Sequence, residues 1–304
     1  MNVLSVRGLC KRYGSFALRD VSFDVAPGSI TGFIGRNGAG KTTTLKSLLD
    51  FVHPDAGEAL FFGRPLSADE FGVKQAVGFA SGGFGFYPLK RLRTVTDVTR
   101  RFYPSWDETA YRRYLALFAL DENKRVKELS EGMKVKYALA LALSHRARLL
   151  VLDEPTSNLD AGAIVQLHDM IAVMKRQGVT VVLAEHRLAW ITDLADRYFF
   201  FAAGRLAAQW SAAEFAALPA DTLAGYGLRA RTLDDCRAGI RAKQSARCPG
   251  TPVLTLEGVT LGCDKKHPLR TLPDMSFAAG EIVGLMGRNG IGKTSIFDGF
   301  TWLL

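Results

Sequence analysis

The chain carries one phosphate-binding sequence twice, and this repeat limits its fold more than any other feature. Residues 35–42 read GRNGAGKT and residues 287–294 read GRNGIGKT, and both match the pattern G-x-x-x-x-G-K-[ST]. Each copy follows a short apolar run that is expected to form a strand, at residues 30–34 and 282–286. Glycines let backbone N–H groups approach phosphate oxygens, the start of the next helix adds positive charge, and the lysine reaches the outer phosphates. The repeat therefore predicts strand–loop–helix units that bind a nucleotide.

The similarity between the two halves extends beyond the loops. Leu18-Arg-Asp-Val-Ser-Phe precedes the first loop, and Leu272-Pro-Asp-Met-Ser-Phe precedes the second. A length of 304 residues suits about two domains. We expect a complete domain over residues 1–228, a basic linker over 229–252, and the truncated N-terminal part of a second domain over 253–304.

Composition argues against several classes of protein. No apolar run approaches the roughly 18 residues of a membrane span, and the N-terminus lacks the apolar core of a secretion signal. The four cysteines contain no C-x-x-C pair, which argues against a zinc site or a disulfide framework. The net charge of +9 indicates a basic surface, with an anionic membrane face or a nucleic acid as alternative partners.

Strands and helices are expected to alternate through the first domain. The expected strands cover residues 21–25, 58–62, 77–82, 149–152, 179–184 and 197–201. The expected helices cover residues 40–51, 94–102, 107–120, 133–145, 163–176, 187–195 and 211–217. This alternation predicts an α/β domain with a largely parallel sheet.

Two carboxylates, Asp153 and Glu154, directly follow the apolar run at residues 149–152. At the end of a buried strand, Asp153 is expected to hold Mg²⁺, directly or through water, and Glu154 to orient and deprotonate the attacking water. The alternative is a pair of surface carboxylates without a role. The phosphate-binding loop in the same chain favours the catalytic interpretation.

With these motifs, residues 1–217 resemble the ATP-binding subunit of an ABC transporter, and residues 253–304 resemble the opening of a second copy. The resemblance implies a P-loop NTPase of the ABC ATPase type, with a mostly parallel sheet, an antiparallel β subdomain and a helical subdomain. It also implies ATP and Mg²⁺ as cofactors. In this family ATP is sandwiched between the phosphate-binding loop of one domain and the signature loop of another.

The resemblance assigns roles to residues around the nucleotide. Tyr13 matches the aromatic residue that stacks on adenine, and Thr42 matches the hydroxyl that ligates Mg²⁺ beside Asp153. Catalytic roles fall to Lys41, Glu154 and to His186, which matches the switch histidine at the γ-phosphate. The matching phosphate-binding residues are Asn37, Gly38, Gly40, Lys41, Thr42 and Thr43, with Lys293 and Thr294 in the second loop.

Other matching residues face the partner domain in the family. Ser130 and Gly132, in Leu129-Ser-Glu-Gly-Met, match the signature loop, and Asp160 matches the loop that crosses the dimer interface. Ser130 and Gly132 are expected to open a long helix, whose free N–H groups and positive dipole end suit a γ-phosphate.

The sequence departs from the family pattern at one loop in particular. The strand at residues 77–82 ordinarily leads to a glutamine that helps to hold Mg²⁺ and senses the membrane domain, but Gly82 stands there and Gln75 precedes the strand. Residues 70–152 resemble ATPases of small bacterial exporters, whereas residues 157–304 resemble tandem ATPases of energy-coupling factor importers. This difference suggests a chain joined near residues 152–158.

The resemblance implies an ATP-binding subunit that hydrolyses ATP at a dimer interface and drives transport through a separate transmembrane permease subunit. Its expected location is cytoplasmic, peripheral on the inner face of the cell membrane. The expected partners include a second ATPase domain, in a homodimer or heterodimer, and exclude nucleic acid and metals other than Mg²⁺. The alternatives are a non-transport ABC ATPase that acts on the ribosome or nucleic acid, and an inactive nucleotide-binding fragment. Residues 253–304 contain no signature loop or switch histidine, so we expect no hydrolysis there.

Overall fold

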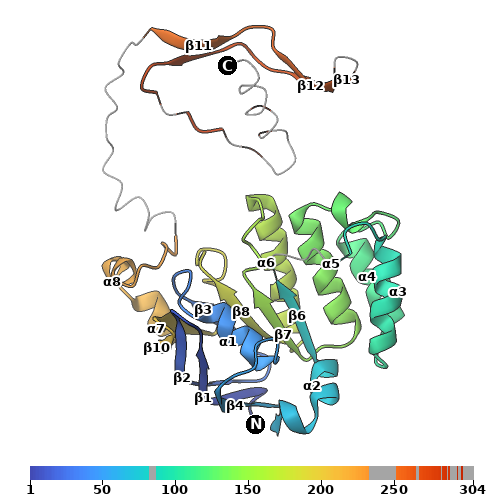
Figure 1. Ribbon diagram of the computed structural model, residues 1–304, viewed down its shortest axis with the longest axis vertical. Coiled ribbons are helices and arrows are strands. Elements are labelled where there is room, and N and C mark those ends of the chain that lie inside the picture. Colours follow the sequence, from blue (N-terminus) through green and yellow to red (C-terminus); the bar gives the residue numbers. More distant parts are fainter. Residues whose placement is uncertain are drawn as a thin grey trace. The chain divides into compact units, whose positions relative to one another are not determined.

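The apolar segment before the first phosphate-binding loop forms β3 (Ile30–Ile34), a fully buried strand inside a six-stranded sheet. The strand order is β10-β9-β3-β8-β7-β6 (Figure 1). The strands parallel to β3 are β6 (Val77–Ser81), β7 (Leu149–Asp153), β8 (Thr180–Glu185) and β9 (Arg197–Ala202), and β10 (Arg205–Ser211) is antiparallel to β9. Because the carboxyl ends of parallel strands lie at one edge, the loops that follow β3, β7 and β8 meet there.

The computed structural model describes residues 1–81, 87–232, 251–264, 267–281, 283–285, 287, 293 and 296. The chain divides into two units, Met1–Gly239 and Ile240–Leu304. Both sheets of the α/β fold, and all the helices named below, belong to the first unit.

A second, antiparallel sheet packs against the first with the order β2-β1-β4-β5. Its strands are β1 (Leu4–Arg12), β2 (Ala17–Val25), β4 (Ala56–Phe61) and β5 (Arg64–Pro65). Helix α1 (Lys41–Leu48) contributes Leu45 and Leu48 to the buried cluster that joins the two sheets. Within this cluster, the Phe33 ring of β3 lies 5.2 Å from the Phe23 ring and 4.9 Å from the Phe201 ring.

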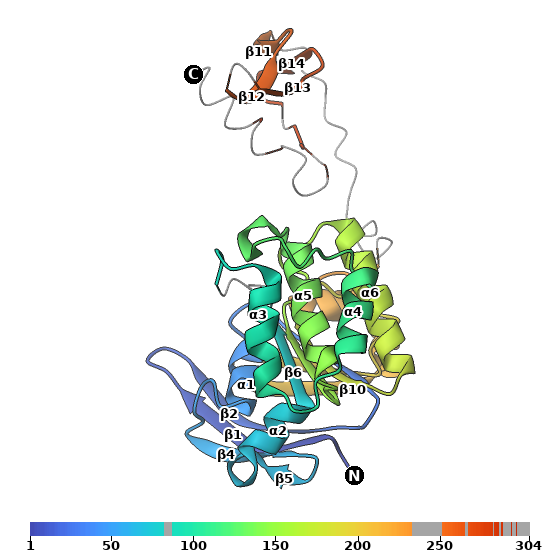
Figure 2. The ribbon, with the colours of Figure 1, turned by 90° about the vertical axis from the view of Figure 1, so that its right-hand side faces the viewer.

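The remaining helices of the first unit follow in chain order. They are α2 (Glu70–Ala76), α3 (Leu92–Thr99), α4 (Glu108–Leu117), α5 (Glu131–Ser144), α6 (Ala161–Arg176), α7 (Ala212–Ala217) and α8 (Ala220–Gly225). Single 3₁₀ turns lie at Leu66–Ala68, Arg100–Phe102 and Val126–Glu128. Helices α3, α4 and α5 stand side by side in both views (Figure 2).

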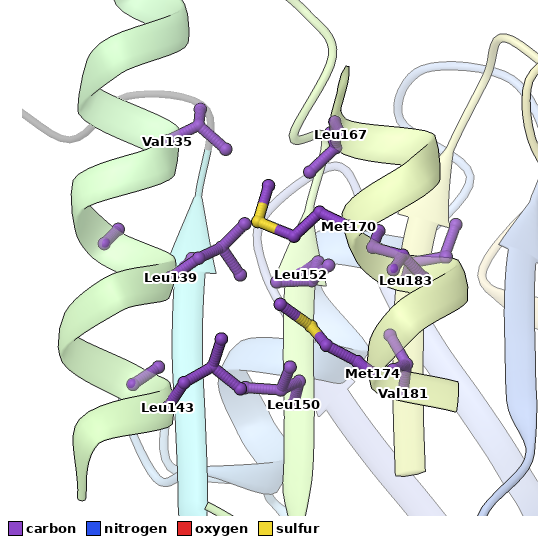
Figure 3. Close-up of a cluster of buried hydrophobic side chains, with 14 of the residues drawn as sticks. Val135, Leu139, Leu143, Leu150, Leu152, Leu167, Met170, Met174, Val181 and Leu183 are labelled. Carbon is purple, nitrogen blue, oxygen red and sulfur yellow. The ribbon is translucent and has the colours of Figure 1, made fainter. Parts of the chain in front are cut away.

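Successive side chains of a strand point to opposite faces of the sheet, so the six-stranded sheet contributes to two buried clusters. Leu150 and Leu152 of β7 join the cluster formed with α5 and α6, whereas Leu149 and Val151 face the antiparallel sheet. Figure 3 shows the first cluster, in which Leu139 of α5 and the side chains of α6 meet over β7 and β8. Each fully buried leucine contributes about 1.5–3 kcal/mol through removal of apolar surface from water.

The expected helix over residues 187–195 is wrong, because the structure has a series of turns there. The Ile191 and Leu194 N–H groups bond to carbonyl oxygens three residues earlier. The Tyr198 hydroxyl donates to the carbonyl oxygens of Ile191 and Thr192, at 3.1 Å each, and so ties this turn segment to β9. The apolar residues of the segment are nevertheless buried, Ile191 fully.

The described part of the second unit begins like the first. Strands β11 (Pro252–Leu256), β12 (Thr260–Asp264), β13 (His267–Thr271) and β14 (Met275–Ala278) form two antiparallel pairs, β11 with β14 and β12 with β13. Gly258 follows β11 with φ of 60°, close to the 61° of Gly8 in β1. The Gly8 N–H donates to Ser22 Oγ and the Gly258 N–H donates to Asp274 Oδ1, so both glycines are held by the side chain of a facing segment.

Across the described ranges, none of the helices combines the length and the apolar character that crossing a membrane requires.

Candidate nucleotide-binding site

The first phosphate-binding loop has the backbone that phosphate cradling requires. Gly35 and Gly40 adopt φ of 145° and 113°, values that side chains disfavour. A Cβ atom on Gly35 would lie 2.3 Å from the Phe201 carbonyl oxygen, so only glycine fits. Asn37 and Gly38 lie at the exposed tip of the loop, and Thr43 is half-buried in the first turn of α1.

Lys41 points back into the loop from the start of α1. Its side chain is only 3% exposed, and its Nζ donates to the carbonyl oxygens of Gly35 at 2.8 Å and Arg36 at 3.1 Å. Burial lowers the pKa of Lys41, while the carboxylates of Glu154 and Asp153 oppose that shift. A desolvated ammonium group inside a ring of backbone groups is suited to an anionic ligand such as a phosphate.

Thr42 and Asp153 form the candidate magnesium site. The Thr42 Oγ1 donates to Asp153 Oδ1 at 2.8 Å, which joins α1 to the end of β7. Burial raises the pKa of the Asp153 carboxyl, and the Thr42 hydrogen bond opposes this. Hydroxyl and carboxylate oxygens are hard ligands that suit Mg²⁺, which takes its remaining ligands from waters and substrate phosphates. Among the described residues, no group of three or more His, Cys, Asp or Glu could hold a metal ion.

Glu154 leaves the sheet with an unusual backbone. Its φ is 48°, in the left-handed region that residues other than glycine rarely adopt, and its N–H donates to the Ala184 carbonyl oxygen at 3.0 Å. Such conformations cost of order 1–3 kcal/mol and concentrate at functional sites. The side chain is half-buried at the sheet edge, beside Asp153.

His186 follows β8 at the same edge. Its Nδ1 is buried, has no hydrogen-bond partner in the part of the chain that the structure describes, and lies 3.9 Å from Glu185 Oε2. The register of the parallel strands places Asp153 opposite Ala184, two residues before His186. The structure therefore brings Lys41, Asp153, Glu154 and His186 to one edge of the six-stranded sheet.

Sequence reasoning missed Glu185, the last residue of β8. This carboxylate is fully buried and accepts hydrogen bonds from Thr156 and from two backbone N–H groups. The available signal was a charged residue directly after the apolar run at residues 181–184, where a buried strand ordinarily has none.

Tyr13 lies between β1 and β2, outside the sheet edge. Its ring is 43% exposed, with the Phe16 ring centroid 6.4 Å away and Lys11 Nζ 5.9 Å from its centre. The ring borders an open groove of about 750 Å³ that Arg12 and Leu18 also line. An exposed aromatic face of this kind is available for stacking on a flat ring.

The signature residues lie at the starts of α5 and α6. Ser130 caps α5 by accepting the Met133 N–H at 3.3 Å, and Asp160 caps α6 by accepting the Ala163 N–H at 2.9 Å. Gly132 allows the two helix starts to approach, because a Cβ atom there would lie 3.3 Å from Ala163 Cβ. Ser130 is exposed, so it can contact another molecule. The expected helix start is confirmed, two residues earlier than Met133.

Two further expectations fall partly outside the described residues. Thr294 and Gly82 lie outside them, while Lys293 Nζ donates to the Gly287 carbonyl oxygen at 2.6 Å. The second loop thus repeats the contact of Lys41 with Gly35. Gln75 lies in α2, where its Nε2 donates to the Phe102 carbonyl oxygen at 2.8 Å, away from the end of β6.

The chain is similar to several proteins of one kind. The family model described as ABC transporter matches residues 18–157. The ABC transporter ATP-binding protein YtrB of Bacillus subtilis is 32% identical over 203 residues, 65% of this chain and 68% of that protein. The Ribose import ATP-binding protein RbsA 1 of Rubrobacter xylanophilus is 29% identical over 305 residues, 97% of this chain but only 58% of that protein. A solved structure of an ATP binding subunit of an ABC transporter superposes with a TM-score of 0.64 and 26% identity, over 78% of this chain and 98% of the other.

Proposed function

This chain belongs to the family of ABC transporter ATP-binding proteins, and on that premise we propose how its residues bind and hydrolyse ATP. It is an ATP-hydrolysing subunit of a transporter. The triphosphate lies in the loop at residues 35–42, where backbone N–H groups and the Lys41 ammonium group bind its oxygens. The Tyr13 ring stacks on adenine. The observation that carries this proposal is the meeting of Lys41, Asp153, Glu154 and His186 at one sheet edge.

Each residue of the edge has a distinct task in hydrolysis. Thr42 and Asp153 would hold Mg²⁺, which would supply neutralisation of the phosphate charge. Glu154 accepts a proton from the attacking water and orients its lone pair toward the γ-phosphate. His186 donates a hydrogen bond to a γ-phosphate oxygen, and its buried Nδ1 has no hydrogen-bond partner among the described residues.

The site is completed by a second ATPase domain. The exposed Ser130, together with Gly132, offers the N-terminal N–H groups of α5 to a γ-phosphate held by the partner, and Asp160 lies at the same interface. Two copies of the chain are the simplest pair. The work is done on a separate transmembrane permease subunit, with this chain on the cytoplasmic face of the membrane.

The second loop, with Lys293 and Thr294, binds phosphate but does not hydrolyse ATP. The support is the contact of Lys293 with Gly287, which repeats that of Lys41. The relatives named above are transport proteins, which does not favour the alternative of a ribosome- or nucleic-acid-acting ATPase. An inactive nucleotide-binding fragment is the remaining alternative. MgATP turnover by the purified chain would rule it out, and the absence of turnover would favour it.

Glu154→Gln tests the assignment of the base. Glutamine keeps the shape of the side chain but cannot take the proton, so MgATP turnover of the purified chain should fall by at least about a hundredfold. Nucleotide affinity should stay within about threefold, because the phosphate cradle is unchanged. Turnover and equilibrium binding of a fluorescent ATP analogue are the measurements. Near-normal turnover in Glu154→Gln would show that another group is the base.

A further inference from the structure

Four hydrogen-bond donors converge on the buried carboxylate of Glu185. Its Oε1 accepts from the Thr156 N–H at 3.2 Å and from the Thr156 hydroxyl at 2.6 Å. Its Oε2 accepts from the N–H groups of His186 at 3.1 Å and Arg187 at 3.3 Å. The side chain is fully buried and is 0% exposed. Burial of a charged group in this way is tolerated only when hydrogen bonds satisfy it.

These bonds connect two loops that the proposed mechanism uses separately. Thr156 lies two residues after Glu154, in the loop that follows β7, and His186 begins the loop that follows β8. The Glu154 N–H adds a further link, because it donates to the Ala184 carbonyl oxygen at 3.0 Å. The backbone positions of Glu154 and His186 are therefore set relative to one another through the end of β8.

We propose that Glu185 is a positioning residue for hydrolysis, which holds the loop of the base and the loop of the switch histidine in one fixed arrangement. The proposal rests on the roles proposed above for Glu154 and His186. Glu185 itself is fully buried and acts through Thr156 and through the backbone of residues 186 and 187. Its Oε2 accepts from the His186 N–H but lies 3.9 Å from His186 Nδ1, too far for a hydrogen bond, so it holds the backbone of His186 and not the ring.

The chemistry of the four partners explains why a carboxylate is needed. All four are donors, and an ionised carboxylate accepts at both oxygens. A glutamine of the same shape has one acceptor oxygen, and its amide N–H groups would face the N–H groups of one of the two loops. Glu185→Gln therefore releases one loop while filling the same volume.

Thr156 provides a matched pair of variants. Thr156→Val keeps the branched shape and removes the hydroxyl that bonds to Oε1, whereas Thr156→Ser keeps the hydroxyl. We expect Glu185→Gln and Thr156→Val to lower kcat for MgATP by about tenfold or more, because displaced catalytic groups lose orientation. The ATP dissociation constant should stay within about threefold in both, because neither residue lies in the phosphate cradle. Thr156→Ser should restore kcat to within about threefold of the wild-type value.

Amide hydrogen exchange gives a readout that is independent of turnover. In Glu185→Gln and Thr156→Val, exchange should become faster in residues 154–158 and 185–188 while the strands around them keep their protection. Faster exchange throughout the sheet, with kcat and ATP affinity falling together, would mean a general structural role and would overturn the proposal. If Glu185→Gln does not fold, the comparison of Thr156→Val with Thr156→Ser decides alone.

Glu154→Gln, assayed beside these variants, distinguishes failure of the proposed base from failure of the proposed positioning role of Glu185. If Glu154→Gln abolishes turnover while Glu185→Gln and Thr156→Val keep wild-type kcat, the positioning role is wrong and the proposed function stands. If Glu154→Gln itself keeps turnover, the proposed assignment of the base fails, whatever the Glu185 variants do.

Discussion

Lys41 places an ammonium group inside the phosphate-binding loop. Its Nζ bonds to the carbonyl oxygens of Gly35 and Arg36, while the carboxylates of Asp153 and Glu154 stabilise its charge. The loop is thus built around a buried cation, which suits an anionic ligand such as a phosphate.

Lys41→Met tests how much the Lys41 ammonium group contributes to the binding of MgATP. Methionine keeps a long unbranched stem but has no charge, so the affinity for MgATP should fall by about tenfold or more, which equals about 1.4 kcal/mol. Lys46→Met is the matched control, because Lys46 lies on the same helix and is exposed. Isothermal titration of the three proteins measures the effect. Equal affinity of Lys41→Met and Lys46→Met for MgATP would contradict the proposal that Lys41 binds the phosphates.

The candidate site was predictable from the sequence only where its residues lie in a local pattern. The loop at residues 35–42 and the pair Asp153 and Glu154 have fixed spacings, so the motifs identify them. Glu185 has no such signal for its role, because its partner Thr156 is 29 residues away in sequence. The two meet because β7 and β8 are neighbours in the sheet, and strand order is a property of the folded chain.

At the scale of elements, the expected helix and strand types agree with the structure wherever the apolar pattern is strong. The buried strands around residues 149–152 and 179–184 are confirmed, and so is the helix that Asp107 caps by accepting the Ala110 N–H. The error at residues 187–195 has a physical cause that the sequence alone does not reveal. The hydroxyl of Tyr198, on the next strand, donates to carbonyl oxygens of that segment, so tertiary contacts hold the segment in turns despite its helical periodicity.

His168 of α6 joins this turn segment through a second tertiary contact. Its Nε2 lies 3.0 Å from Asp193 Oδ2, and its Nδ1 lies 3.1 Å from Asp169 Oδ1. Burial lowers the pKa of His168, but the hydrogen bonds with Asp169 and Asp193 outweigh this and raise the pKa overall. With a carboxylate at each ring nitrogen, the doubly protonated imidazolium is the form that satisfies both contacts.

His168→Gln should therefore destabilise the protein only at low pH. A raised pKa in the folded state means that the stabilisation is fully present below the ordinary pKa and is lost as the pH rises through the folded value. We expect the free energy of unfolding to fall by about 0.5–1 kcal/mol at pH 5.5 and to be unchanged at pH 9. Urea unfolding of the wild type and the variant at both pH values measures this. A loss of equal size at both pH values would contradict the charged pair.

At the scale of the whole molecule, the first unit presents its functional residues as two separate groups. One is the sheet edge with Lys41 and Glu154, and the other is the pair of helix starts with Ser130 and Asp160. Gly132 packs against Leu159 and Ala163, so the start of α5 is held beside the start of α6 within the first unit. A helix start suits an anionic ligand, and we propose that another molecule supplies it here. The resemblance predicts that the second group faces a partner domain, and this stays a prediction.

Mixing two inactive chains tests whether that other molecule is a second copy. Lys41→Met removes the ammonium group from the phosphate-binding loop, and Ser130→Arg blocks the exposed helix start. Each variant alone should therefore hydrolyse MgATP no faster than the inactive Glu154→Gln variant. An equal mixture should regain about a quarter of the wild-type turnover, because half of randomly formed pairs are mixed and each of these has one intact site of two. Thermal melting must first show that Ser130→Arg folds, since loss of the cap costs about 1 kcal/mol. If the turnover of the mixture stays at the level of Glu154→Gln, the site is not shared between two copies of this chain. If the turnover recovers and rises with protein concentration, the reaction takes place at the interface of two copies.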